Sequence, residues 1–205
     1  MASAALDPTT RDRAAQPESA SPGQKPTLPT PGVAAAEAGR SAPEPSASAR
    51  PAIDAAEVSA PERLRVPWLD VDIALDELGL DKDGTLEVPE SAQDVGWFSA
   101  GTAPGGTGAA VLTGHVDSAK GPGVFYHLSL LPEGAQVFVD RADGSTAVFE
   151  VDRVAAYRKD KLPTAEVYSS PGSSLRLVTC GGDWDDKAES YRDNVVAYAE
   201  LVDIQ

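Results

Sequence analysis

The sequence predicts an all-β domain, folded as a closed barrel or a sandwich, behind a long segment rich in Ala, Pro and Ser. From about residue 60 onward, short apolar or alternating runs recur between clusters of Gly, Pro and Asp, which is typical of many short strands joined by turns. Residues 1–60, by contrast, contain nine of the 17 prolines and no aromatic residue. We therefore expect two regions, a segment 1–60 and a domain 61–205.

The segment 1–60 lacks the apolar side chains that a core needs. Its only large aliphatic residues are Leu6, Leu28, Val33, Ile53 and Val58. Their surface is too small to offset the ~1–2 kcal/mol of backbone entropy that each ordered residue loses. We expect a disordered linker or stalk. The first residues show neither the basic region nor the apolar stretch of a signal peptide.

The composition of the chain excludes several classes of protein. The 205 residues carry a formal net charge of −15 and include one Cys. Most of the acidity lies in residues 61–205, which argues against binding nucleic acid or an anionic membrane surface. A single Cys excludes an internal disulfide and a multi-thiolate metal site. No run of about 18 apolar residues is present, so the sequence predicts no membrane-spanning helix.

The first half of the domain contains three expected strand regions. Residues 69–75 alternate between apolar and polar, as a half-buried strand does, and the alternation resumes at 86–88 after a turn at 81–84. Asp81, Asp83 and Gly84 resemble the start of a calcium loop, but the distal Glu is missing, so we expect a turn and no metal. Residues 109–113 predict a buried strand.

The second half predicts a hairpin and two further strands. Alternating residues at 136–139 and 147–154 flank turn residues at 141–144. Apolar strands are expected at 175–179 and 194–202. Helix content should be low, with one short helix or turn within 123–130.

Three side chains at expected strand ends are candidates for chemistry. Cys180 is the only thiol and precedes Gly181 and Gly182, although a lone Cys is also common as a buried structural residue. His115 follows the strand 109–113 and is the histidine best placed to activate a thiol, whereas we expect His127 to be structural. Arg192 precedes the last strand and offers several fixed N–H donors, or forms a solvated ion pair. Together they fit nucleophilic acyl transfer without a metal.

The segments around these residues resemble the motifs of the sortase family. Residues 113–118 resemble the sortase His motif, and residues 177–182 resemble the TLxTC motif, with Arg176 where the first Thr usually stands. Residues 191–196 are similar to the Arg strand of the actinobacterial class F group. Residues 78–89 and 95–98 also resemble that group, and the likeness covers about residues 61–203.

The resemblance implies an eight-stranded β-barrel and a cysteine transpeptidase without a cofactor. Such enzymes cleave an LPxTG-type sorting signal between Thr and Gly and pass the acyl group from a thioacyl-enzyme to an amine of a cell-wall precursor, or to water. By motif position, Cys180 would be the nucleophile, His115 the general acid/base and Arg192 the stabiliser of the scissile carbonyl, with support from Thr179 and Gly181. The expected location is the outer face of the cell envelope, and the expected state is a monomer.

Two other interpretations stay open at the level of sequence. The first is a non-catalytic β-barrel binding module at the cell surface on a flexible stalk, which would have no need for the Cys, His and Arg together. The second is an L,D-transpeptidase, in which the His and Cys lie close in sequence, whereas here they are 65 positions apart.

Overall fold

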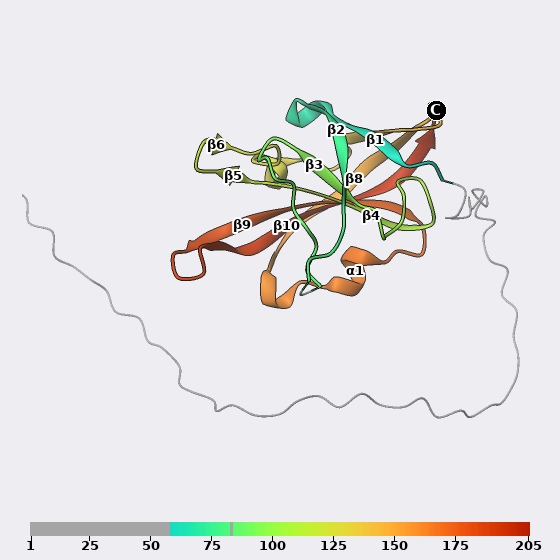
Figure 1. Ribbon diagram of the computed structural model, residues 1–205. Helices are drawn as coiled ribbons and strands as arrows, with labels where there is room; N and C mark the ends of the chain where they lie inside the picture. Colours follow the sequence, from blue (N-terminus) through green and yellow to red (C-terminus); the bar gives the residue numbers. More distant parts are fainter. Residues whose placement is uncertain (1–57, 83) are drawn as a thin grey trace, which may run out of the picture. The chain divides into compact units, whose positions relative to one another are not determined.

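The computed structural model describes residues 58–82 and 84–205, in which eight strands close into a barrel (Figure 1). The strands of the barrel are β1 (Pro61–Val66), β2 (Val71–Leu78), β3 (Val95–Phe98), β4 (Gly108–Gly114), β7 (Gln136–Arg141), β8 (Thr146–Arg158), β9 (Ser173–Asp185) and β10 (Ser190–Ile204). This confirms the expected all-β class and the closed eight-stranded barrel. The expected linker, up to residue 57, and Asp83 of the expected turn lie outside the described residues.

The remaining elements are short. A separate hairpin consists of β5 (Asp117–Ser118) and β6 (Gly121–Pro122). The helical elements are the 3-10 turns η1 (Pro67–Leu69), η2 (Leu128–Leu130) and η3 (Lys159–Lys161) and the helix α1 (Thr164–Tyr168). The short helix or turn expected within 123–130 is therefore present as η2.

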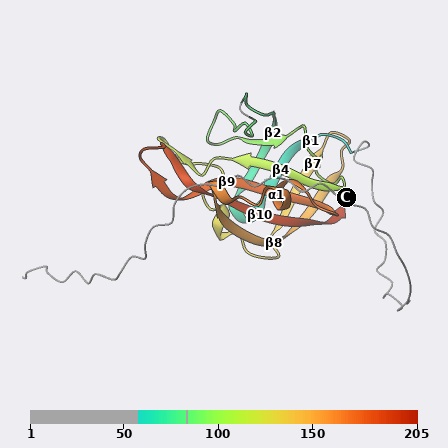
Figure 2. The same cartoon turned by 90° about the horizontal axis from the view of Figure 1, so that it is seen from below.

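The order of strands around the barrel is β1-β2-β3-β4-β9-β10-β8-β7, with β7 returning to β1. The pairs β2–β3 and β4–β9 are parallel, and the other neighbours are antiparallel. Figure 2 shows β9 and β10 side by side with α1 next to them. The chain order thus brings β4 and β9, which lie far apart in sequence, into direct contact.

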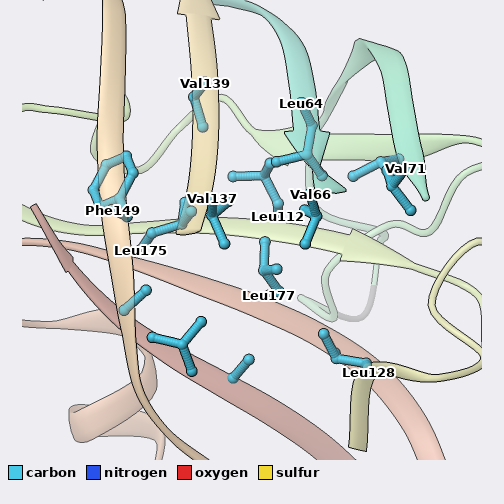
Figure 3. Close-up of a cluster of buried hydrophobic side chains, with 14 of the residues drawn as sticks. Leu64, Val66, Val71, Leu112, Leu128, Val137, Val139, Phe149, Leu175 and Leu177 are labelled. Carbon is cyan, nitrogen blue, oxygen red and sulfur yellow. The ribbon is translucent and has the colours of Figure 1, made fainter. Parts of the chain in front are cut away.

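The barrel interior holds the main core, because alternate residues of each strand point inward. Figure 3 shows the side chains of Leu64, Leu112, Val137, Leu175 and Leu177 converging there. Each of these five is at most 1% exposed. Burying one such side chain contributes about 1.5–3 kcal/mol to stability.

A second, smaller cluster lies on another face of β9 and β10. Val167 of α1 packs with Val196 and Tyr198, and Val178 borders this cluster. Side chains alternate between the two faces of a strand. Leu177 points into the barrel and Val178 points outward, so Cys180, two residues after Val178, also points outward. The outer face of β9 therefore presents Cys180.

The structure differs from the sequence prediction in two places. No strand forms at the expected region 86–88, where only Leu86 is bridged to Leu80 across a tight turn. The other difference is at the hairpin of β9 and β10. The expected strands 175–179 and 194–202 are longer, since β9 runs to Asp185 and β10 begins at Ser190. Cys180 and Arg192 consequently lie within strands and not at strand ends, and residues 183–185 belong to β9. The hairpin is extended by backbone pairing of Tyr191 with Trp184. Backbone pairing does not require alternating apolar residues, so the sequence pattern does not indicate this extension.

Candidate functional site

Cys180 is half-buried on the outer face of β9 and is a free thiol. Its partner across the antiparallel pairing is Asn194 of β10. Since the strand residues on both sides of it are hydrogen-bonded into the barrel, its backbone is held in a fixed position. This is the kind of rigid platform that a reacting side chain requires.

His115 follows directly after β4, the other neighbour of β9. The parallel register pairs Thr113 with Val178, so continuing both strands by two residues brings His115 level with Cys180 and onto the same face. The ring nitrogen Nε2 of His115 lies 2.7 Å from the carbonyl oxygen of Pro89. Because a carbonyl only accepts hydrogen bonds, Nε2 is the donor.

The two side chains line one hollow of about 510 Å³, the Cys180 pocket. Its lining includes His115, Asp117, Cys180, Trp184, Glu189 and Tyr191. His115 and Asp117 come from the end of β4 and from β5, and the others come from the β9–β10 hairpin. Among the described residues, this is therefore where the predicted nucleophile and the predicted acid/base meet.

A contact between the β5–β6 hairpin and β10 lies at this pocket. The hydroxyl of Tyr191 donates a hydrogen bond to the carboxylate of Asp117, and the rings of Tyr191 and Trp184 meet edge to face with centroids 5.1 Å apart. The hydrogen bond to Asp117 is the main cause that raises the pKa of Tyr191, since it stabilises the protonated phenol. The two sides of the pocket are thus joined by one polar contact.

Arg192 lies two residues before Asn194 on β10, next to Tyr191, which lines the Cys180 pocket. The register of β9 and β10 shifts between Tyr191 and Asp193, so that two residues of β9, including Gly182, oppose Arg192. Gly182 has a φ of 74°, which suits glycine at such a bulge.

The guanidinium of Arg192 is not part of the Cys180 pocket. Its Nε lies 3.3 Å from Oδ2 of Asp185, and the side chain lines a neighbouring hollow with Arg158 and Lys159. Backbone N–H groups of Lys187 and Ala188, and then Arg192, lower the pKa of Asp185. Arg192 is therefore paired with a carboxylate beside the pocket.

Thr179 and Gly181 flank Cys180 on β9. Thr179 is buried, and its hydroxyl has no hydrogen-bond partner among the described residues. A Cβ at Gly181 would lie 2.7 Å from Cγ2 of Val195, so a side chain there would clash with the core. Neither residue is among those that line the Cys180 pocket.

His127 lies in a different place. It is exposed beside Tyr126 and lines a separate hollow with Asp70 and Asp72. In the part of the chain that the structure describes, no three His, Cys, Asp or Glu side chains are grouped as metal ligands would be. No helix within this part is long and apolar enough to cross a membrane.

Sequence reasoning did not single out Pro89, Tyr191 or Trp184 as parts of the site. Tyr191 and Trp184 lie next to motif residues, and their aromatic character beside a thiol was an available signal. Pro89 contacts His115 through its main-chain carbonyl, and every residue has such a carbonyl, so the sequence cannot indicate this contact.

Two neighbouring parallel strands of the closed barrel bring one Cys and one His to a shared pocket. The fold and the site therefore define the class of the protein as a β-barrel with a cysteine–histidine site. A comparison with protein-family models matches the sortase domain over residues 64–202. The chain therefore belongs to the sortase family, the cell-envelope cysteine transpeptidases that act on sorting signals. No curated protein matched the sequence.

Solved structures of other sortases share this fold. A lid mutant of sortase A from Corynebacterium diphtheriae is 21% identical with a TM-score of 0.55, and the alignment covers 72% of each chain. Sortase C1 of Streptococcus agalactiae in complex with MTSET is 19% identical with a TM-score of 0.54, covering 69% of this chain and 67% of that one. Sortase C-1 from Actinomyces oris is 21% identical with a TM-score of 0.52, covering 69% and 71%.

Proposed function

We propose that this chain is a class F sortase that cleaves an LPxTG-type sorting signal between Thr and Gly, with Cys180 as the nucleophile and His115 as the general acid/base. The observation that supports this most directly is the shared pocket of Cys180 and His115, reached from two neighbouring parallel strands. The motifs around both residues and around Arg192 support class F. We further propose that residues 1–60 form a linker and that residues 61–205 form the catalytic domain.

In the first half of the reaction the thiolate of Cys180 attacks the carbonyl carbon of the Thr residue. The C=O electrons move to oxygen and form a tetrahedral oxyanion. This intermediate collapses by breaking the C–N bond to Gly, and the leaving amine takes a proton from the imidazolium of His115. A thioester on Cys180 and a neutral imidazole remain, which is why His115 must act as an acid and not only as a base.

In the second half an amine of a cell-wall precursor, the proposed acceptor, attacks the thioester. His115 takes the proton from the attacking nitrogen, and the thiolate of Cys180 leaves. The product is a new amide, and the enzyme returns with a thiolate and an imidazolium. Water in place of the amine gives the free acid, so slow hydrolysis accompanies the transfer.

Arg192 is the proposed donor to the oxyanion. The ion pair with Asp185 is exposed and screened by solvent, so releasing the guanidinium from it costs little. The support for this assignment is the resemblance of residues 191–196 to the sortase Arg strand, since the guanidinium itself lies outside the Cys180 pocket. Thr179 and Gly181 are proposed to help through their backbone beside the nucleophile.

The test is a thioacyl adduct. The chain is incubated with a fluorogenic LPxTG-type peptide, with and without an amine acceptor, and its intact mass is measured. We expect a mass increase on Cys180 that the acceptor removes, and no adduct on the folded Cys180→Ala variant. Peptide transfer by Cys180→Ala at the parent rate would refute the mechanism. An inert thiol together with no adduct over a panel of sorting peptides would favour a binding module on the cell surface.

A further inference from the structure

We propose that the main-chain carbonyl of Pro89 is the third member of the site, a positioning group that holds the ring of His115 and fixes which of its nitrogens exchanges the proton. This inference rests on the proposed role of His115. The observation behind it is the hydrogen bond of 2.7 Å between Nε2 of His115 and the carbonyl oxygen of Pro89.

The hydrogen bond determines where the proton is exchanged. A carbonyl oxygen has no proton to give, so Nε2 keeps its hydrogen in both the neutral ring and the imidazolium. The nitrogen that gains and loses a proton is then Nδ1. The same carbonyl stabilises the imidazolium, as the partner of a catalytic histidine commonly does.

The carboxylate nearest in sequence does not take this role. Asp117, two residues after His115, accepts the hydroxyl of Tyr191. The partner of the His115 ring is therefore a carbonyl, which brings no negative charge next to the thiol.

Pro89 is held in place by the loop between β2 and β3. The loop begins with a small hairpin in which Leu80 and Leu86 form a bridge. The carboxylate of Glu87 accepts a hydrogen bond of 2.7 Å from the amide of Gly79, and the amide of Glu87 donates to the carbonyl of Gly79. Pro89 itself is buried and its φ is fixed by its ring, so fewer backbone rotations are available to move its carbonyl.

His115 is held from the other side as well. Its own carbonyl accepts a hydrogen bond of 3.0 Å from the amide of Phe125. Gly123 packs so closely that a Cβ there would lie 2.5 Å from that carbonyl oxygen. The backbone of His115 is therefore fixed by residues 123–125, while its ring is fixed by Pro89.

The first test reads the tautomer directly. The chain has two histidines, so in the ¹⁵N-labelled variant His127→Gln the nitrogen spectrum of the ring reports His115 alone. We expect the neutral ring to carry its hydrogen on Nε2. A neutral ring with its hydrogen on Nδ1 would overturn the proposal, and this readout needs no substrate.

The second test loosens the loop. Glu87→Ala removes the acceptor for the amide of Gly79, whereas Glu87→Gln keeps an acceptor in the same place. We expect Glu87→Ala to mix the two tautomers and to lower kcat about five-fold with little change in KM, as the loss of one ordinary hydrogen bond would. Glu87→Gln should restore both. A folded Glu87→Ala variant with the parent tautomer and the parent kcat would also overturn the proposal.

The two proposals can fail separately. If the hydrogen lies on Nε2 but no thioacyl adduct forms, the orientation of the ring stands and the proposed reaction falls. If the adduct forms but the hydrogen lies on Nδ1, the reaction stands and the role of Pro89 falls.

Discussion

Replacing Gly123 by alanine should displace the end of β4 and with it His115. A Cβ at this position would lie 2.5 Å from the carbonyl oxygen of His115, 2.9 Å from its carbonyl carbon and 3.0 Å from the carbonyl oxygen of Ala92. All three are backbone atoms, so no side chain can rotate to make room. The backbone of residues 115–116 or that of residues 123–125 must move.

The cost can be worked from the hydrogen bonds that this movement strains. The amide of Gly123 donates to Val116, and the amide of Phe125 donates to His115. At about 1 kcal/mol each, with some added cost from the steric contact, the loss is about 2–3 kcal/mol. For a domain of this size the melting temperature should fall by about 6–12 °C. A displacement approaching 1 Å at the ring should lower the rate of thioacyl formation about 100-fold.

The assay pairs this variant with Gly172→Ala. A Cβ at Gly172 would approach nothing closer than Oε2 of Glu200 at 4.0 Å, and the residue is exposed. The control should be as stable as the parent, or more stable by up to about 1 kcal/mol, because alanine restricts the unfolded chain. Melting temperature and adduct formation are measured on both. Equal stability and equal rates for the two variants would refute the reasoning.

Three further outcomes are expected. Arg192→Lys should lower the rate of thioacyl formation by 100-fold or more, because an ammonium cannot reproduce the donor geometry of the guanidinium, and a parent rate would exclude Arg192 as the oxyanion donor. Tyr191→Phe should remove the one tyrosine whose pKa is raised by a hydrogen bond to Asp117. That hydrogen bond is present below the usual phenol pKa of about 10 and is lost as the pH rises through the raised pKa of Tyr191. The absorbance of phenolate measures this titration, and an unchanged titration in the variant would contradict the assignment. Arg65 is hydrogen-bonded to Asp140 at 3.0 and 2.7 Å where β1 meets β7, and it lowers the pKa of that carboxyl. The stability that this pair contributes is present above the usual Asp pKa of about 3.9 and is lost as the pH falls through the lowered pKa. Denaturant unfolding of Asp140→Asn should therefore show a weaker acid dependence than that of the parent, and identical pH profiles would count against the pair.

The barrel was predictable from the sequence because its inward side chains are apolar. Ala110, Leu112, Leu175 and Leu177 lie in apolar runs, and such runs indicate buried strands whatever their neighbours are. The pairing of β4 with β9 was not predictable from these runs, because strand order depends on which edges remain open as the chain folds. The motif resemblance predicted a barrel of eight strands but no order for them, and the order is seen only in the structure.

Two local features could not be predicted, for different reasons. The helix α1 has five residues, too few for an isolated helix to be stable, and it forms because Val167 buries itself against Val196 and Tyr198. The position of Arg192 inside β10 depends on backbone pairing in a polar hairpin, which hydropathy does not report. Cys180 and His115 were identified as candidates from residue type and strand position, and their meeting in one pocket was visible only in three dimensions.

The parallel pairing of β4 with β9 also governs when the thiol and the imidazole first meet. Their strands are separated by β5 to β8, so no local hairpin brings them together, and contacts of such long sequence separation form late in folding. A nascent or misfolded chain therefore carries a Cys and a His that do not share a pocket. The pairing of the proposed nucleophile with the proposed acid/base thus depends on the long-range β4–β9 contact.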